Sequence, residues 1–143
     1  MVLWWALRRA NMNPCVIRLV WLLSVTLVLV AGTTVIINNN LKNRKDLTIH
    51  CKSKDDDLGV HVLSYGESYD FEFEPDIFWR TLFFCRMTWN GKSHWYDVYD
   101  EYVERLYGDS GGCLQIEDDK CVWNVIEFGL CTPKTADCYP WNR

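Results

Sequence analysis

Residues 81–99 read TLFFCRMTWNGKSHWYDVY, in which two aromatic-rich runs flank Asn90-Gly91. Asn-Gly favours a two-residue type I′ turn, because both residues accept positive φ, and this turn joins the strands of an antiparallel hairpin. The turn fixes the register of the hairpin, and residues directly opposite each other share one face. In the predicted register, Phe83 lies opposite Val98, Cys85 opposite Tyr96, and Met87 opposite His94. We therefore predict one apolar patch, with Cys85 pointing into the core, that consists of Phe83, Cys85, Met87, Tyr96 and Val98.

Other stretches show the alternation of half-buried strands. Residues 69–74, YDFEFE, place aromatic side chains on one face and acids on the other, and residues 47–52, LTIHCK, place the cysteine on an apolar face. Shorter strands are predicted at residues 35–37 and 60–63, and a last strand at 121–128. Short strands at regular spacing, without a convincing amphipathic helix, indicate an all-β sandwich or barrel. We expect a small antiparallel β-sandwich whose tail is an irregular coil held by two cysteines.

The N-terminus predicts export. Residues 1–18 contain arginines and no acid, and residues 19–30 form an uncharged run that is followed by the small residues Ala31-Gly32. This order is typical of a cleaved secretory signal, and the uncharged run is shorter than the about 20 residues that a membrane-spanning helix needs. Extending the run back to Val16 leaves a signal anchor as the alternative. We expect a signal peptide over residues 1–32, a secreted domain over residues 33–143, and no stable membrane insertion after cleavage.

Cysteine content and net charge indicate what kind of protein this is and which partners it disfavours. The chain has seven cysteines and a formal net charge of −4. The acidic balance argues against a nucleic-acid partner, which needs a basic face. Loss of Cys15 with the signal would leave an even number, which in a small secreted domain predicts disulfide bridges whose connectivity the sequence leaves open. The cysteines expected in these bridges are Cys51, Cys85, Cys113, Cys121, Cys131 and Cys138.

Three motifs could carry chemistry, and each has a simpler interpretation. Residues 108–112 spell GDSGG, as around the nucleophile of chymotrypsin-like proteases, but the chain is too short for their two barrels and lacks the segment around their histidine base. The consecutive acids at residues 55–57 cannot all point at one calcium ion, and zinc-type C-x2-C pairs are missing. We expect residues 108–112 and residues 55–57 to form loops. We expect no catalytic residue, no metal and no cofactor.

The stretch HCKSKDDDLG at residues 50–59 resembles a hallmark of the plant self-incompatibility S-protein homologue family. The order of other motifs also resembles that family: N-N-L after residue 38, T-L-F-x-C at residues 81–85, an aromatic-D-x-Y strand at residues 95–99, and C-x-W at residues 121–123. The likeness covers about residues 34–130. Members of the family are small, secreted, disulfide-bonded β-sandwich proteins with no known catalytic role, and the founding members are stigma ligands for a pollen surface receptor.

The resemblance implies a secreted, monomeric, non-enzymatic ligand of a cell-surface protein receptor, acting in pollen–stigma recognition or a related reproductive or developmental process. It matches four family cysteines to Cys51, Cys85, Cys113 and Cys121, whereas Cys131 and Cys138 depart from the pattern and are expected to bridge each other. Loops on a rigid sandwich are where recognition tends to lie. The residues that we expect in receptor-binding loops are Lys54, Asp55, Asp56, Asp57, Asp100, Glu101 and Glu104.

Two alternatives stay open. A small secreted hydrolase could use a pair of carboxylates, and a convergent pocket with perturbed carboxylates would favour it. A defence or toxin-like binder of membranes or sugars would instead show exposed aromatic patches. The eight Trp and seven Tyr could form a sugar platform, although at this density aromatic residues more often build the core.

Overall fold

The computed structural model describes residues 13–28, 32–76, 78, 80–102, 113, 120–133 and 135–142. The chain divides into two compact units, Met1–Ala31 and Gly32–Arg143. The first unit contains the helix α2 (Pro14–Val28). Within the described residues, no helix combines the length and apolar character needed to cross a membrane.

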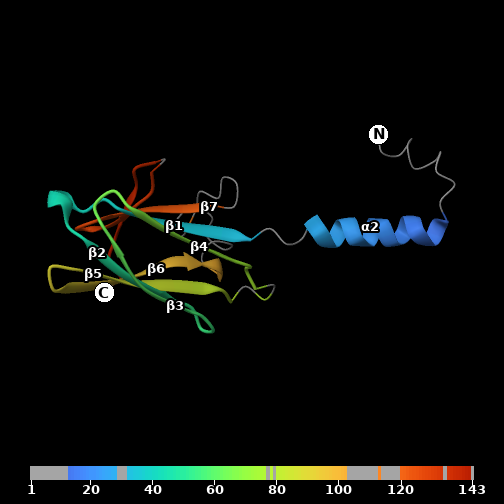
Figure 1. The fold of residues 1–143 in the computed structure, drawn as a ribbon, viewed down its shortest axis with the longest axis horizontal. Helices are drawn as coiled ribbons and strands as arrows, with labels where there is room; N and C mark the ends of the chain where they lie inside the picture. Colours follow the sequence, from blue (N-terminus) through green and yellow to red (C-terminus); the bar gives the residue numbers. More distant parts are fainter. Residues whose placement is uncertain are drawn as a thin grey trace. The chain divides into compact units, whose positions relative to one another are not determined.

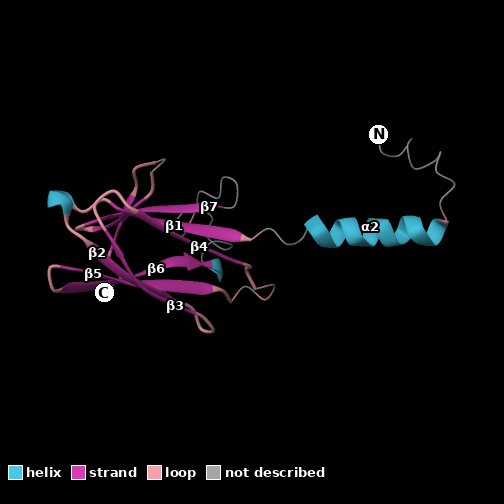
Figure 2. Cartoon of the chain, viewed as in Figure 1, coloured by secondary structure: helices cyan, strands magenta, loops and turns pink. Residues whose placement is uncertain are grey.

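The second unit consists of two β-sheets stacked on each other (Figures 1 and 2). One sheet has the strand order β4-β1-β7-β8-β9 and the other has the order β3-β2-β5-β6. The strands of the first sheet are β1 (Thr33–Asn39), β4 (Ser68–Phe73), β7 (Lys120–Ile126), β8 (Gly129–Cys131) and β9 (Cys138–Pro140). Those of the second sheet are β2 (Leu47–Lys52), β3 (Asp57–Leu63), β5 (Leu82–Trp89) and β6 (Lys92–Asp100). A short 3₁₀ helix, η1 (Lys42–Arg44), precedes β2.

The predicted β-sandwich is confirmed, but it is not antiparallel throughout. β1 runs parallel to β7, with Val35 opposite Cys121 and Ile37 opposite Trp123, while its other neighbour β4 is antiparallel. Parallel neighbours need a long crossover, and here the chain from β2 to β6 supplies it. Alternation within a strand reveals which face is buried and says nothing about the direction of its partner, which is why the sequence analysis missed this pair.

The β5–β6 hairpin follows its predicted register only near the turn. Asn90 and Gly91 have φ of 48° and 73°, as a type I′ turn requires, and Cys85 lies opposite Tyr96 as predicted. The register then shifts, so that Phe83 faces Tyr99 and not Val98. This β-bulge brings the consecutive residues Val98 and Tyr99 both into the core.

Aromatic side chains from the two sheets meet in the core. Ring centroids lie 4.5 Å apart for Phe73 and Phe83 and 5.4 Å apart for Tyr96 and Trp123. The predicted alternation of β2 and β4 is confirmed, since Cys51 and Phe71 are buried while the polar residues between apolar ones face outward. The core of the sandwich therefore forms where the sequence pattern placed it.

A buried amide explains part of the N-N-L motif. Asn39 is fully buried at the end of β1, and its Nδ2 donates hydrogen bonds to the carbonyls of Lys45 and Leu63, each at 2.8 Å. Its Oδ1 accepts a hydrogen bond from the backbone N–H of Leu41 at 3.1 Å. One side chain thus fastens the segment before β2 to the end of β3, and satisfies its own polar atoms in doing so.

The C-terminal region differs from its prediction. The last long strand ends at Ile126, followed by a turn in which Phe128 is 78% exposed. The expected coil is a short hairpin of β8 and β9, in which Cys131 pairs directly with Cys138. The disulfides are Cys51–Cys85, Cys113–Cys121 and Cys131–Cys138, so the expected bridge in the tail is confirmed.

Candidate receptor-binding surface

The loop between β2 and β3 carries the HCKSKDDDLG stretch, and its serine builds the turn. Ser53 Oγ accepts hydrogen bonds from the backbone N–H groups of Asp56 at 3.0 Å and Asp55 at 3.3 Å. The backbone N–H of Ser53 donates to the carbonyl of Asp56 at 2.9 Å. A serine hydroxyl can replace a backbone partner in this way and close a tight turn. The turn leaves Lys54, Asp55 and Asp56 exposed, as predicted for a recognition loop.

Asp57 has a different role from its neighbours. Its carboxylate lies 2.8 Å from Nζ of Lys52 and 2.6 Å from Nε2 of His50, and it accepts a hydrogen bond from the backbone N–H of Gly59 at 3.0 Å. The hydrogen bond from Lys52, followed by those from His50 and Gly59, holds the pKa of Asp57 well below its usual range. Asp57 therefore fixes the base of the loop across the bulge between β2 and β3.

An open groove of about 760 Å³ lies beside this loop. The chain from Ser53 to Asp56 contributes to its lining, and so does the connection between β4 and β5. Apolar side chains, including the half-buried Phe73 and the exposed Leu82, form part of the surface. Carboxylates outnumber cations among the lining residues, which include Asp55, Asp56, Glu72, Glu74 and Asp76 against Lys54 and Arg80. The groove is therefore acidic and partly apolar, a combination that suits a basic partner with some apolar surface.

The β4–β5 connection is held in place by its own polar groups. The backbone N–H of Asp76 donates to Thr81 Oγ1 at 2.7 Å, and Asp76 Oδ1 accepts from the backbone N–H of Phe78 at 2.9 Å. Arg80 forms an ion pair with Asp76 at 3.3 Å. This side of the groove is consequently shaped by local hydrogen bonds, like the loop on the other side.

Glu101 is not a surface contact, contrary to the prediction. It is only 2% exposed, and its Oε2 accepts a hydrogen bond from the backbone N–H of Thr81 at 3.3 Å, while its own N–H donates to the Thr81 carbonyl at 3.0 Å. The carboxylate therefore supports the end of the β4–β5 connection. Asp100 is half-buried at the end of β6 and accepts a hydrogen bond from the N–H of Tyr102, and Glu104 lies outside the described residues.

The predicted loops lie at two different ends of the sandwich. The loop after Lys52 and the end of β6 at Asp100 lie at the end that holds the groove, because β2 and β6 both run antiparallel to β5. The turns at residues 64–67 and 90–91 lie at the opposite end, beside Leu47 and the start of β2. Local sequence patterns did not indicate Glu72, Glu74, Asp76 or Arg80 as residues of this surface. Alternation in YDFEFE placed the glutamates outside, but only the stacking of two sheets brings them near residues 53–56.

Two observations bear on metal-binding and acid–base chemistry at this surface. Within the described parts of the chain, no group of three or more His, Cys, Asp or Glu residues could hold a metal ion. The lowered pKa of Asp57 suits a permanent anion and not a general acid, which needs a pKa near neutrality. The GDSGG stretch lies outside the described residues.

The two sheets, the disulfides and the loop-lined groove define a small disulfide-bonded β-sandwich protein. The sequence model of the family "Plant self-incompatibility protein S1" matches residues 34–141. The chain belongs to this family, as the resemblance of its motifs indicated.

Individual relatives agree with this assignment. The chain is 45% identical to S-protein homolog 2 of Arabidopsis thaliana, in a match that covers 77% of this chain and 68% of that protein. It is 41% identical to S-protein homolog 5 of the same plant, over 76% and 78% of the two chains. A solved structure of self-incompatibility protein homologues, described as small, highly stable, secreted plant proteins, superposes with a TM-score of 0.53 and 15% identity over 78% of this chain and 96% of that one. This similarity shows a shared fold.

Proposed function

We propose that the protein is a secreted, non-enzymatic ligand that binds a cell-surface protein receptor through the acidic groove. The observation that carries this proposal is the groove itself, which two structured loops line with exposed carboxylates next to apolar side chains. Family membership supports a role in signalling between plant cells. The process that we propose is pollen–stigma recognition or a related reproductive or developmental response.

Export is part of the same proposal. The family and the fold support an extracellular protein, and the compact unit that contains all of the paired cysteines begins at Gly32, where we expect signal cleavage to occur. Disulfides persist in an oxidising compartment outside the cell. The mature protein is the β-sandwich unit, and its expected state is a monomer.

Electrostatics provides the proposed basis of recognition. The chain carries a net charge of −4, and loss of residues 1–18, which contain arginines and no acid, would make the domain more acidic. A basic receptor patch would be attracted to the groove, which speeds association and disfavours wrong partners. Apolar contact with side chains such as Phe73 would then slow dissociation.

The test is a cell-binding assay with charge-reversal variants. Fluorescently labelled protein is applied to pollen, stigma and ovule cells, and saturable binding is measured for the wild type and for a variant that combines Asp55→Lys, Asp56→Lys and Glu74→Lys. We expect the variant to bind at least about tenfold more weakly at moderate salt.

Asp46→Lys is the matched control, because Asp46 is exposed and precedes β2 at the opposite end of the sandwich. It should bind like the wild type, and both variants should unfold at the wild-type temperature. Undiminished binding of the triple variant, or an equal loss in the control, would contradict the proposed site.

A further inference from the structure

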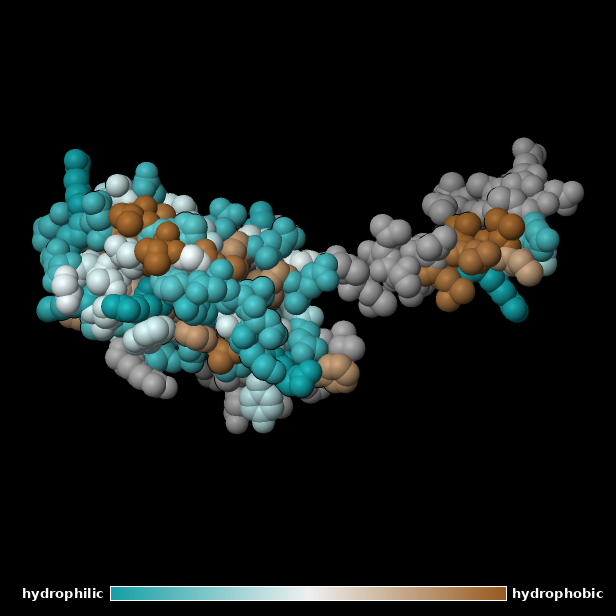
Figure 3. All heavy atoms as spheres, turned by 60° about the horizontal axis from the view of Figure 1, so that its bottom comes forward, coloured by the Kyte–Doolittle hydropathy of each residue, from teal (hydrophilic) through white to brown (hydrophobic). Residues whose placement is uncertain are grey.

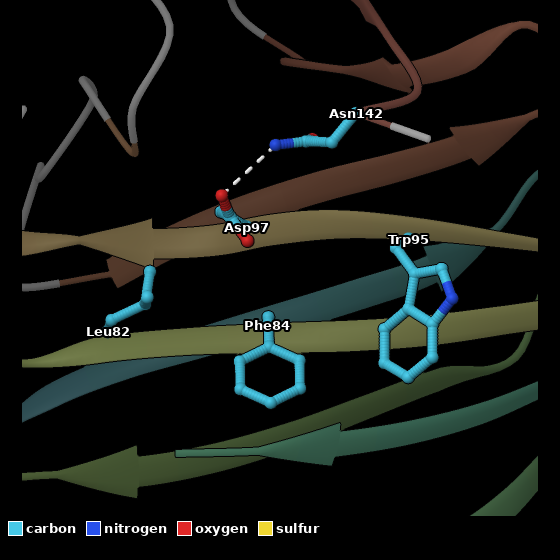
Figure 4. Close-up of a pocket in the computed structure, with 5 residues that line it drawn as sticks. All are labelled: Leu82, Phe84, Trp95, Asp97 and Asn142. Carbon is cyan, nitrogen blue, oxygen red and sulfur yellow. Dashed lines mark hydrogen bonds between the residues drawn. The ribbon is translucent and has the colours of Figure 1, made fainter. Parts of the chain in front are cut away.

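A second pocket lies on the outer face of β5 and β6. It has a volume of about 380 Å³ and is lined by Leu82, Phe84, Trp95, Asp97 and Asn142 (Figure 4). Strand alternation turns these side chains away from the core, since their neighbours Phe83, Cys85 and Tyr96 are the buried ones. Leu82 and Phe84 also line the acidic groove, whereas Trp95, Asp97 and Asn142 belong to this pocket.

Two aromatic rings form a platform in the pocket. The ring centroids of Phe84 and Trp95 are 5.9 Å apart on neighbouring strands, and the ring planes are inclined by 44°. Trp95 is 39% exposed, whereas Phe84 is half-buried. Figure 4 shows both rings with their faces turned toward the viewer, beside each other on the outer face of the sheet. Exposed aromatic faces of this kind gain free energy when C–H groups of a ligand cover them.

A polar pair stands next to the platform. Asn142 Nδ2 donates a 3.0 Å hydrogen bond to Asp97 Oδ2, shown as the dashed line in Figure 4. The backbone N–H of Asn142 donates to the carbonyl of Trp95 at 3.1 Å. The pair presents carboxylate and amide oxygens that accept hydrogen bonds and an amide that donates them.

The tail that carries Asn142 is anchored by other contacts. Trp141 stacks on His94 with ring centroids 4.9 Å apart, and its indole N–H donates to the carbonyl of Glu127 at 3.0 Å. The polar pair is therefore fixed before any ligand arrives, which reduces the entropy that binding must overcome.

We infer that this pocket binds a neutral oligosaccharide, with one pyranose ring stacked on Trp95 and flanked by Phe84, and with its hydroxyl groups bonded to Asp97 and Asn142. A pyranose ring offers C–H groups on one face and hydroxyl groups, which both donate and accept, around its edge. The pocket offers the complementary features at neighbouring positions. The pocket shares Leu82 and Phe84 with the groove, but its binding of a saccharide does not depend on the proposed receptor role.

The lining argues against other classes of ligand. The carboxylate of Asp97 would repel a carboxylated or sulfated saccharide. An apolar protein surface or a lipid would displace water from Asp97 and Asn142 without replacing the lost hydrogen bonds. Desolvating polar groups in this way costs free energy. On the β-sandwich unit, Figure 3 shows the hydrophobic residues of one face as small patches separated by hydrophilic ones.

The experiment is a titration of the purified protein, obtained by expression of the full chain in plant cells. Cellohexaose, xylohexaose and mannohexaose are the neutral probes, and binding is measured by calorimetry up to about 10 mM. We expect at least one of them to bind, and Trp95→Ala and Asn142→Ala each to weaken that binding by about tenfold or more. Oligogalacturonate is the anionic comparison probe and should bind more weakly. Tetramethylammonium is the cationic probe, and it tests whether the aromatic rings and Asp97 select a cation instead.

The controls separate this site from the groove and from unfolding. Tyr65→Ala removes an exposed aromatic ring at the other end of the sandwich and should bind the neutral probe like the wild type, as should Asp55→Lys. Unfolding temperatures show whether each variant folds, and Asn142→Ala keeps the test valid should Trp95→Ala fail to fold. No binding of any neutral probe, full binding by both pocket variants, or tighter binding of a charged probe would overturn the inference.

Discussion

The indole N–H of Trp123 in β7 donates a 2.9 Å hydrogen bond to the backbone carbonyl of Val98 in β6, so that a single side chain joins the two sheets. Both residues are fully buried. Val98 is the residue at which the β5–β6 register shifts, and the indole gives its carbonyl a partner inside the core. A buried backbone oxygen without such a partner would be unfavourable.

Trp123→Phe tests this connection. Phenylalanine keeps an aromatic ring in the core but has no N–H, which leaves the Val98 carbonyl without this donor and a small void beside it. We expect the free energy of unfolding to fall by about 2–4 kcal/mol, as measured by chemical denaturation. Trp95→Phe is the matched control on the surface and should stay within about 0.5 kcal/mol of the wild type. A loss below about 0.5 kcal/mol in Trp123→Phe would contradict a stabilising role of this hydrogen bond.

The amide of Asn39 should be equally important for stability. Asn39→Ala removes the donor for the carbonyls of Lys45 and Leu63 and the acceptor for the N–H of Leu41. A loss of at least about 2 kcal/mol is expected in denaturation, because buried groups lose their partners. The neighbouring variant Asn40→Ala, at an exposed position, should change stability by less than about 0.5 kcal/mol. If Asn39→Ala is as stable as the wild type, water can replace the hydrogen bonds of the Asn39 side chain.

Reversal of charge at Glu101 should harm folding more than recognition. Glu101→Lys places a cation at a buried position that now holds a carboxylate bonded to the Thr81 N–H, so we expect a loss of at least about 3 kcal/mol in unfolding free energy. Glu74→Lys, at an exposed position, should leave stability within about 0.5 kcal/mol. The folded fraction of a Glu101 variant should still bind target cells. If the Glu101→Lys protein is stable but no longer binds target cells, Glu101 contributes to receptor binding after all.

The ion pairs of Asp57 should make the stability of the fold depend on pH. Its pKa is lowered in the folded protein, so its ionised form stabilises the fold above the usual aspartate pKa of about 3.9, and that contribution is lost as the pH falls below this value toward the folded-state pKa. The unfolding temperature of the wild type should therefore drop more steeply between about pH 5 and pH 2.5 than that of Asp57→Asn. Asp55→Asn, in the same loop, is the control and should follow the wild type. Parallel curves for the wild type and Asp57→Asn would show that the contacts with Lys52 and His50 do not stabilise the loop.

Local sequence patterns predicted much of the sandwich. Alternation in LTIHCK gave the bounds of β2 and its buried cysteine, and Asn90-Gly91 gave a hairpin whose register holds as far as Cys85 and Tyr96. Both results depend on neighbours within a few residues, which strand geometry and turn chemistry govern directly. The exposed acids of the loop after Lys52 were predicted for the same reason.

The sequence by itself therefore determined the segments that form the strands from β1 to β7, the buried faces of β2 and β4, and the cysteines that belong to the domain. The two short strands of the tail, β8 and β9, were predicted as coil. Only the tertiary structure decided the parallel pairing of β1 with β7, the bulge at Val98, the burial of Glu101, and the groove and pocket that combine distant segments. The reason is physical: alternation encodes the orientation of a side chain relative to its own strand. The partners that each strand, carbonyl or carboxylate finds across the core are set when the two sheets pack.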